Sequence, residues 1–279
     1  MRLRKRKLLT KFFADRGTHL AAMIAYFALL SFVPLLFITL SLLGFAGRAN
    51  ESSYFVKEMK HVFPGASVSG IVSAVDTVRH HAAALGIIGG IALLWASLSL
   101  FSVLESACNI VYGRPNRSFL HGKALALLLM IGSTVTLWAA LLVGSVGVDV
   151  LRRYGGGFLA KGYVGYTLSV IVSLLGIFVF LFAVYYLLTN APMTFRGVLP
   201  GALAAACLLE ATFQVLPVYL RLSKHVIALQ TLGAPALLLV WMYVMANVIV
   251  LGAEVNWWFH ERRQRGQELT DAAAYEPAR

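Results

Sequence analysis

The sequence predicts an all-α fold, that of a polytopic membrane protein with six transmembrane helices. Two features of the composition indicate this class: 59% of the 279 residues are hydrophobic and only 13% are charged, whereas roughly 25% are charged in a typical soluble chain. The third feature is that the apolar residues gather in six long runs. So few charges cannot cover a soluble domain of this length, and the high hydrophobicity excludes a disordered chain.

Each apolar run is long enough to cross a bilayer as a helix. The hydrocarbon core is about 30 Å thick and takes roughly 20 helical residues, and a helix satisfies its backbone hydrogen bonds within the segment. We therefore expect one membrane domain over residues 1–260, followed by a polar tail at 261–279. The predicted spans are 20–45, 85–110, 122–148, 163–188, 198–220 and 232–259.

The basic residues predict that both termini are cytoplasmic. Six spans place both termini on one side of the membrane. The two tails, the loop between spans 2 and 3 and the loop between spans 4 and 5 carry 15 Lys and Arg residues, against nine in the other three loops. Seven of the 15 lie in the N-terminal tail, which is the element that usually dominates orientation. The tail at 261–279 is therefore expected to be cytoplasmic.

The N-terminal tail is predicted to form an interfacial helix. Its basic residues are interleaved with apolar ones, a pattern typical of a helix lying on the membrane surface. We expect the tail to contact membrane lipids through anionic headgroups, and we do not expect nucleic acid as a partner. The interleaved apolar residues are Leu3, Leu8, Leu9, Phe12 and Phe13.

The first outer loop is the longest segment between spans, at residues 46–84. Residues 53–63 and 68–78 are amphipathic at helical spacing, and Pro64-Gly65 separates them. We therefore expect two short amphipathic helices that lie on the outer face of the membrane or cap a cavity.

Three carboxylates lie within the spans: Glu105, Glu210 and Glu254. A charge at the centre of a span costs about 2.5–3.5 kcal/mol on insertion scales, and the sequence places no Lys or Arg at comparable depth. One interpretation is that the carboxylates line a wet cavity or substrate path. The other is that they form hydrogen bonds between helices that only hold the bundle together.

Other polar residues of the spans share helix faces with these carboxylates. We expect Glu105 or Glu254 to approach a basic residue of the 2–3 loop or Arg196, because buried carboxylates without partners are penalised. Gly197, Gly201 and Ala205 give span 5 a face for close helix contact. The candidate path residues are Glu105, Asn109, Glu210, Gln214, Asn247, Glu254 and Asn256.

Catalytic motifs are absent from the sequence. The seven histidines are dispersed, and neither a zinc-protease motif nor a pair of cysteines at zinc spacing occurs. Gly155-Gly156-Gly157 is not followed by the Lys and Ser or Thr of a phosphate-binding loop. We therefore expect no catalytic residue, no metal and no cofactor, and we do not expect an enzyme.

Several segments together resemble the YihY/BrkB family of inner-membrane proteins. The opening block is Asp15-Arg16 followed by Ala21-Ala22-x-x-Ala25-Tyr26-Phe27-Ala28-Leu29-Leu30-Ser31-x-x-Pro34-Leu35. Trp95 with Asn109-x-x-Tyr112 resembles the second block. Leu199-Pro200-Gly201, Tyr219, Trp241-x-Tyr243 and Leu251-Gly252-Ala253-Glu254-x-Asn256 resemble the closing blocks.

The resemblance implies a six-span bacterial inner-membrane protein. The family is named in part for a virulence-associated serum-resistance factor, and its older ribonuclease BN label is regarded as a misassignment. Our leading hypothesis is a transporter or lipid-translocating protein, and the sequence does not identify its substrate. The alternatives are a structural or envelope-organising membrane protein and, less favoured, a ribonuclease. The sequence leaves the oligomeric state open.

Overall fold

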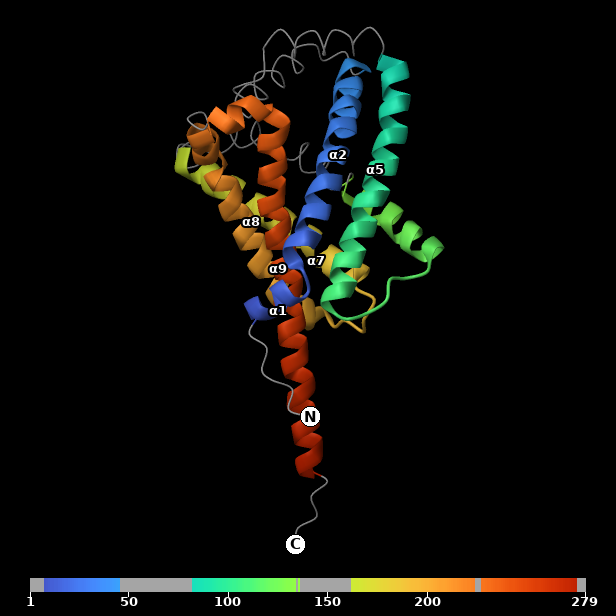
Figure 1. Ribbon diagram of the computed structural model, residues 1–279, viewed down its shortest axis with the longest axis vertical. Coiled ribbons are helices and arrows are strands. Elements are labelled where there is room, and N and C mark those ends of the chain that lie inside the picture. Colours follow the sequence, from blue (N-terminus) through green and yellow to red (C-terminus); the bar gives the residue numbers. More distant parts are fainter. Residues whose placement is uncertain (1–7, 46–81, 134, 136–161, 224–226, 275–279) are drawn as a thin grey trace. The chain divides into compact units, whose positions relative to one another are not determined.

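The computed structural model describes residues 8–45, 82–133, 135, 162–223 and 227–274, and the regular structure within these ranges is helical. This confirms the all-α class (Figure 1). The predicted helices at 53–63 and 68–78 lie outside the described residues. The helices are α1 (Leu8–Ala14), α2 (Gly17–Phe45), α5 (Ala82–Val111), α7 (Gly162–Leu188), α8 (Phe195–Ser223), α9 (Ile227–Ala274) and an unlabelled helix, Phe119–Ser133.

Four helices are long and apolar enough to cross a membrane. Their spanning parts are Gly90–Val111, Val170–Leu188, Phe195–Val215 and Ala236–Gln264. Two further apolar helices, Gly17–Phe32 and Phe119–Ser133, are shorter over the residues searched, and they overlap the first and third predicted spans. The number of six spans therefore stays a prediction.

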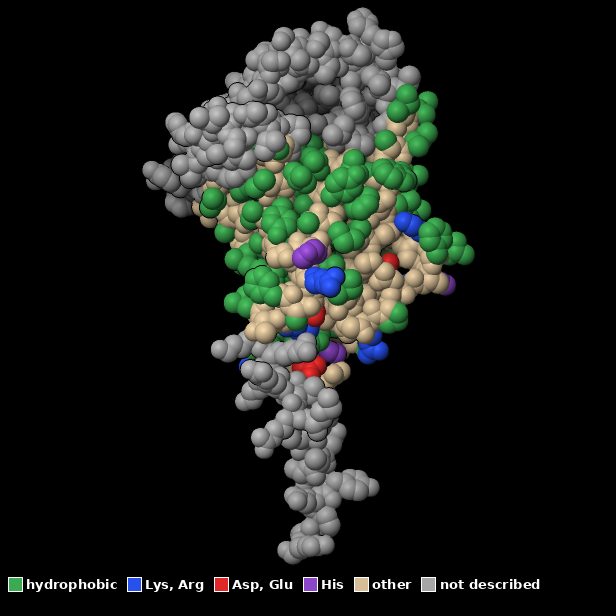
Figure 2. Space-filling model, in the orientation of Figure 1, with side chains coloured by type: hydrophobic (Ala, Val, Ile, Leu, Met, Phe, Trp, Pro, Cys, Tyr) green, Lys and Arg blue, Asp and Glu red, His purple; other side chains and the backbone are tan. Residues whose placement is uncertain are grey.

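Large hydrophobic side chains cover much of the outer surface of these helices. Figure 2 shows them distributed over the described part of one face, where charged side chains are few. Leu175 of α7 is 60% exposed and Leu203 of α8 is 55% exposed. Such exposure is unfavourable in water, where burial of a leucine contributes about 1.5–3 kcal/mol, but it suits a surface that faces lipid.

The chain forms two compact units. Unit 1 comprises Met1–Leu20, Leu104–Ala211 and Asn247–Arg279, and unit 2 comprises Ala21–Val103 and Thr212–Ala246. The core of unit 2 is rich in small residues, and hydroxyls on α5 are satisfied within that helix, since Ser99 Oγ donates to the Trp95 carbonyl at 2.9 Å. The buried hydrophobic residues described in unit 2 are Ala21, Ile24, Ala25, Ala96, Phe101, Trp241 and Ala246.

Within unit 1, glycines allow α8 and α9 to pack backbone against backbone. A Cβ at Gly201 would collide with the Gly252 carbonyl, and a Cβ at Gly252 would collide with the Tyr185 hydroxyl and Ala205. The predicted small-residue contact of α8 is therefore confirmed for Gly201 and Ala205. Gly197 is not part of this contact among the described residues, where a Cβ at this position would approach Thr194 Oγ1, in the segment just before α8.

Two residues with positive φ shape the turns that flank the polar end of unit 1. Gly113 (φ 62°) ends α5, where its N–H bonds to the Ile110 carbonyl and the Arg114 N–H bonds to the Asn109 carbonyl, the pattern of a Schellman cap. Arg16 (φ 57°) joins α1 to α2. The next residue, Gly17, has no side chain that would collide with the ring of Phe12.

Candidate functional site

Glu105 lies near the end of α5 and is bound by Arg117 of the following loop. The Arg117 N–H donates to Glu105 Oε1 at 3.1 Å, and Nη1 of the same arginine lies 3.6 Å from that oxygen. Only 5% of Glu105 is exposed. The expected pairing of a span carboxylate with a basic residue of the 2–3 loop is therefore confirmed.

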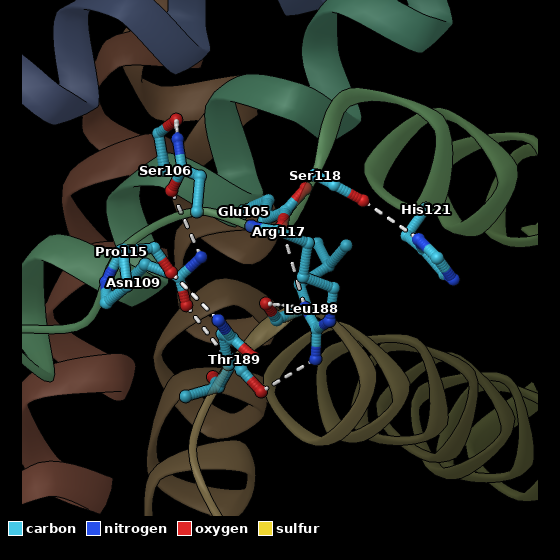
Figure 3. Close-up of polar contacts among 11 residues, drawn as sticks. Glu105, Ser106, Asn109, Pro115, Arg117, Ser118, His121, Leu188 and Thr189 are labelled. Atoms are coloured by element: carbon cyan, nitrogen blue, oxygen red, sulfur yellow. Dashed lines mark hydrogen bonds and ion pairs between the residues drawn. The ribbon is translucent and has the colours of Figure 1, made fainter.

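Arg117 also closes the C-terminal end of α7. Its guanidinium donates to the Leu188 carbonyl at 2.6 Å and to the Thr189 carbonyl at 3.0 Å, as Figure 3 shows. The last carbonyls of a helix have no partner within the helix and carry partial negative charge, which a cation stabilises. One arginine thus joins α5, the loop and the end of α7.

Asn109 ties the same three segments together with neutral hydrogen bonds. It is fully buried, accepts from the Asn190 N–H at 2.7 Å and donates to Asn116 at 3.1 Å. Asn116 in turn donates to Ser106 Oγ at 2.6 Å, and Asn190 donates to the Pro115 carbonyl at 2.9 Å. Both the amide oxygen and the amide nitrogen of Asn109 are bonded to protein, so the arrangement favours a structural role for this residue.

Glu254 on α9 lies beside Lys11, a cation that the sequence analysis did not predict as its partner. Lys11 Nζ of α1 lies 3.0 Å from Glu254 Oε2, pairs with Asp15 and donates to the Val111 carbonyl at 2.8 Å. It also lies 4.2 Å from the centre of the Trp257 ring. The expectation that no Lys or Arg reaches the depth of the span carboxylates was wrong for Glu254, because the Arg16 turn folds α1 back against the ends of α5 and α9.

The helical prediction for the N-terminal tail holds over the described residues. α1 exposes Leu9 and Phe13 by 61% and 65%, whereas Lys11 and Phe12 are buried. Its position at a membrane interface stays a prediction. The four-residue spacing of Lys11 and Asp15 was the signal in the sequence that marked Lys11 as different from the other tail bases.

Four buried polar side-chain atoms make no hydrogen bond within the described part of the chain. They are both carboxylate oxygens of Glu254, the Tyr112 hydroxyl and Nδ2 of Asn256. The 3.0 Å contact between Lys11 Nζ and Glu254 Oε2 is an ion pair, while the same ammonium donates to Asp15 and to the Val111 carbonyl. Burial is the main cause that raises the pKa of Tyr112 above its ordinary value, so this phenol is neutral.

Asn256 bonds through its other amide atom to the α8 backbone. Its Oδ1 accepts from the Gly201 N–H at 2.6 Å, so the side chain holds α8 against α9 at the glycine contact. Asn256 is fully buried. Its role is therefore at least partly structural, although Nδ2 makes no hydrogen bond to the residues that the structure describes.

Glu210 lies deeper in α8, nine residues beyond Gly201 and hence about 13 Å further along the helix axis. It is 8% exposed, and Ser173 of α7 donates to its Oε2 at 2.7 Å. The side chain of Gln214 is exposed and belongs to unit 2, while Asn247 is half-buried in unit 1. Of the seven candidate residues, the structure brings Glu105 and Asn109 together at the end of α5, and Glu254 and Asn256 on α9.

The described residues contain no group of three or more His, Cys, Asp or Glu side chains that could hold a metal ion.

Comparison with protein families matches residues 8–276 to the family described as Virulence factor BrkB. The chain is 26% identical over 276 residues to YfkH of Bacillus subtilis, which is named as ribonuclease-like, covering 94% of this chain and 97% of that protein. It is 26% identical to a UPF0761 membrane protein of Aliivibrio salmonicida, with coverage of 87% and 78%. A UPF0761 membrane protein of Legionella pneumophila is 26% identical, with coverage of 95% and 64%. No solved structure matches the chain.

Proposed function

The chain belongs to the virulence factor BrkB family of bacterial membrane proteins, and from this premise we propose that it is a transporter or lipid-translocating protein of the inner membrane. Residues 1–260 form one six-span membrane domain in this proposal. Residues 261–279 form a polar cytoplasmic tail, whose first part continues α9 as far as Ala274. The four long apolar helices and the two shorter ones support the six spans.

We propose that both termini are cytoplasmic, as the distribution of basic residues favours. A reporter that is active only outside the cytoplasm tests this orientation. Fused after Arg265 it should be silent, and fused within residues 67–77 it should be active. The opposite pattern would reject the topology.

The observation that carries the transport proposal is the burial of three carboxylates in apolar helices. Glu105, Glu210 and Glu254 are between 0% and 8% exposed. Replacing buried ion pairs by apolar residues is often neutral or stabilising, so cohesion of the bundle alone does not require ionisable groups at these depths. Intramembrane ionisable residues are typical of substrate and proton pathways.

In the proposed transporter these carboxylates and their polar neighbours line the path. The substrate enters or leaves at the end of unit 1 that contains Glu105 and Glu254, and Glu210 lies further along α8. The residues proposed to line the path are Glu105, Asn109, Glu210, Gln214, Asn247, Glu254 and Asn256.

A structural or envelope-organising role is the second candidate, and a specific observation favours it. Arg117, Asn109 and Asn256 form hydrogen bonds that hold helices and loops of unit 1 together. Under this alternative the buried polar residues act only as links between helices.

We propose no enzymatic activity. The ribonuclease-like name belongs to YfkH, and hydrolysis of RNA by a metal-dependent route would need a clustered set of ligands. We propose membrane lipids as partners of this chain, with anionic headgroups at the basic N-terminal tail, and we expect no nucleic acid.

Reconstitution of the purified full chain in liposomes tests the proposed function. One assay measures exchange of a labelled lipid between leaflets, and a second measures internal acidification during uptake of candidate solutes. Activity above that of protein-free liposomes and of heat-denatured protein in either assay is the expected result. Inactivity in both assays, together with a lower yield of folded protein for leucine variants of the three carboxylates, would favour the structural alternative.

A further inference from the structure

Two carboxylates share one lysine in the cluster formed by Lys11, Asp15 and Glu254. If both carboxylates are ionised, the cluster carries one net negative charge. The side chains of Lys11 and Glu254 are 6% and 0% exposed, so water contributes little to screening that charge. An uncompensated buried charge is strongly disfavoured, and the binding of one proton removes it.

The hydrogen bonds of Lys11 show which carboxyl is better suited to hold the proton. Its ammonium donates to Asp15 and to the Val111 carbonyl, while neither oxygen of Glu254 makes a hydrogen bond within the described part of the chain. An ionised carboxylate has about four lone-pair sites to satisfy. Asp15 is 19% exposed and keeps contact with water, whereas Glu254 has none.

The other titratable groups around Glu254 do not balance its charge. Lys11 and Asp15 are the charged side chains that act on it. From the end of α5, Tyr112 interacts with Glu254 and with Cys108, and burial keeps its phenol protonated. The ring of His260, on α9, lies 6.0 Å from the ring of Tyr112. Lys11 thus has to serve both carboxylates.

We propose that Lys11, Asp15 and Glu254 form a proton-binding site in which Glu254 carries the exchangeable proton and Asp15 connects the site to water. With Glu254 protonated, Lys11 and Asp15 form a neutral pair that bonds to the end of α5. When the proton leaves, ionised Glu254 competes for Lys11. Proton binding is thereby linked to how α1 is held against α5 and α9.

That this proton drives transport rests on the proposed function, whereas the protonation itself does not. The two can therefore fail separately. The test measures the proton directly by infrared difference spectroscopy on the full chain in lipid, because a protonated carboxyl group has a carbonyl stretch that an ionised carboxylate lacks.

The wild-type chain should show a carboxyl band that disappears as pH rises, and Glu254→Gln should remove it. Glu261→Gln, which changes a half-buried carboxyl on the same helix, should leave the band in place. Asp15→Asn removes a neighbouring negative charge and should move the midpoint to lower pH by about one unit or more. Lys11→Met removes the cation and should move it to higher pH.

A band that persists in Glu254→Gln, or a midpoint that is unchanged in Asp15→Asn, would overturn the proton site. Asp15→Asn keeps Lys11 and Glu254 in place, so its result remains decisive even if Lys11→Met fails to fold. Liposomes made from the same preparation measure transport separately. If the Glu254 band titrates but the liposomes are inactive, the proposed function alone is rejected. If the liposomes are active but the band is missing, the proton site alone is rejected.

Discussion

Glu105 and Glu254 are both buried carboxylates of apolar helices in unit 1, yet their surroundings differ. Glu105 accepts a backbone hydrogen bond from Arg117, whose guanidinium is itself bonded to two carbonyls at the end of α7. Glu254 lies beside a lysine that directs its hydrogen bonds to other groups. A satisfied carboxylate fixes a structure, whereas an unsatisfied one is free to change its protonation state. Each of the following predictions tests this contrast, in order of the expected effect on folding.

Arg117→Ala should be the most destabilising change. It leaves Glu105 without its cation and removes two bonds from the end of α7, and breaking a buried pair costs about 3–5 kcal/mol. The measurement is the free energy of unfolding in detergent, or the yield of folded protein. Arg114→Ala is the matched control, because Arg114 lies in the same loop and is exposed. Equal stability of the two variants would show that Glu105 does not depend on Arg117.

Gly252→Ala should be the second most destabilising change. Its Cβ would collide with the Tyr185 hydroxyl and Ala205, and overpacking of this kind costs about 1–3 kcal/mol. Because Gly252 lies two residues before Glu254, the change also tests whether the α8–α9 contact positions that carboxylate. Gly176→Ala on α7 is the control, since no atom of the residues that the structure describes lies within 4 Å of a Cβ there. Loss of thermal stability in both variants alike would contradict the close contact.

The contrast itself is tested by changing each carboxyl to its amide. Glu105→Gln weakens charge-assisted bonds to Arg117 and should cost about 1.5–3 kcal/mol. Glu254→Gln puts a neutral amide of the same shape where the proposed proton site holds a neutral carboxyl, so it should change the unfolding free energy by less than Glu105→Gln does. Chemical denaturation of both variants beside the wild type measures the difference. A larger loss for Glu254→Gln would reverse the assignment of roles.

The contrast also shows which features the sequence can predict. Apolar runs are local, so the helices that contain them were predictable, and the Glu105–Arg117 pair followed from the short loop between the two residues. Lys11 and Glu254 are brought together only by the tertiary fold, because the turn at Arg16 bends α1 back onto α9. A local sequence pattern does not predict that α1 packs against α9. The bond from Gly201 to Asn256 was unpredictable for the same reason, although the small residues of α8 marked one side of the contact.

Glu210 provides the last test, because a hydroxyl from α7 donates to it and a charge within a predicted span is costly. If Glu210 exchanges protons or contacts a cationic substrate group, Glu210→Gln should abolish transport while the folded protein remains in the membrane. If Glu210 only links α7 and α8, the glutamine should be almost silent, because it can still accept the Ser173 hydrogen bond, and Glu210→Leu should lower the yield of folded protein. Ser173→Ala separates the two further, since a structural link weakens by about 0.5–1.5 kcal/mol when its donor is lost. Normal transport by the glutamine variant in the liposome assays would exclude a working role for Glu210 and leave Glu254 as the carboxyl on which the proposed function depends.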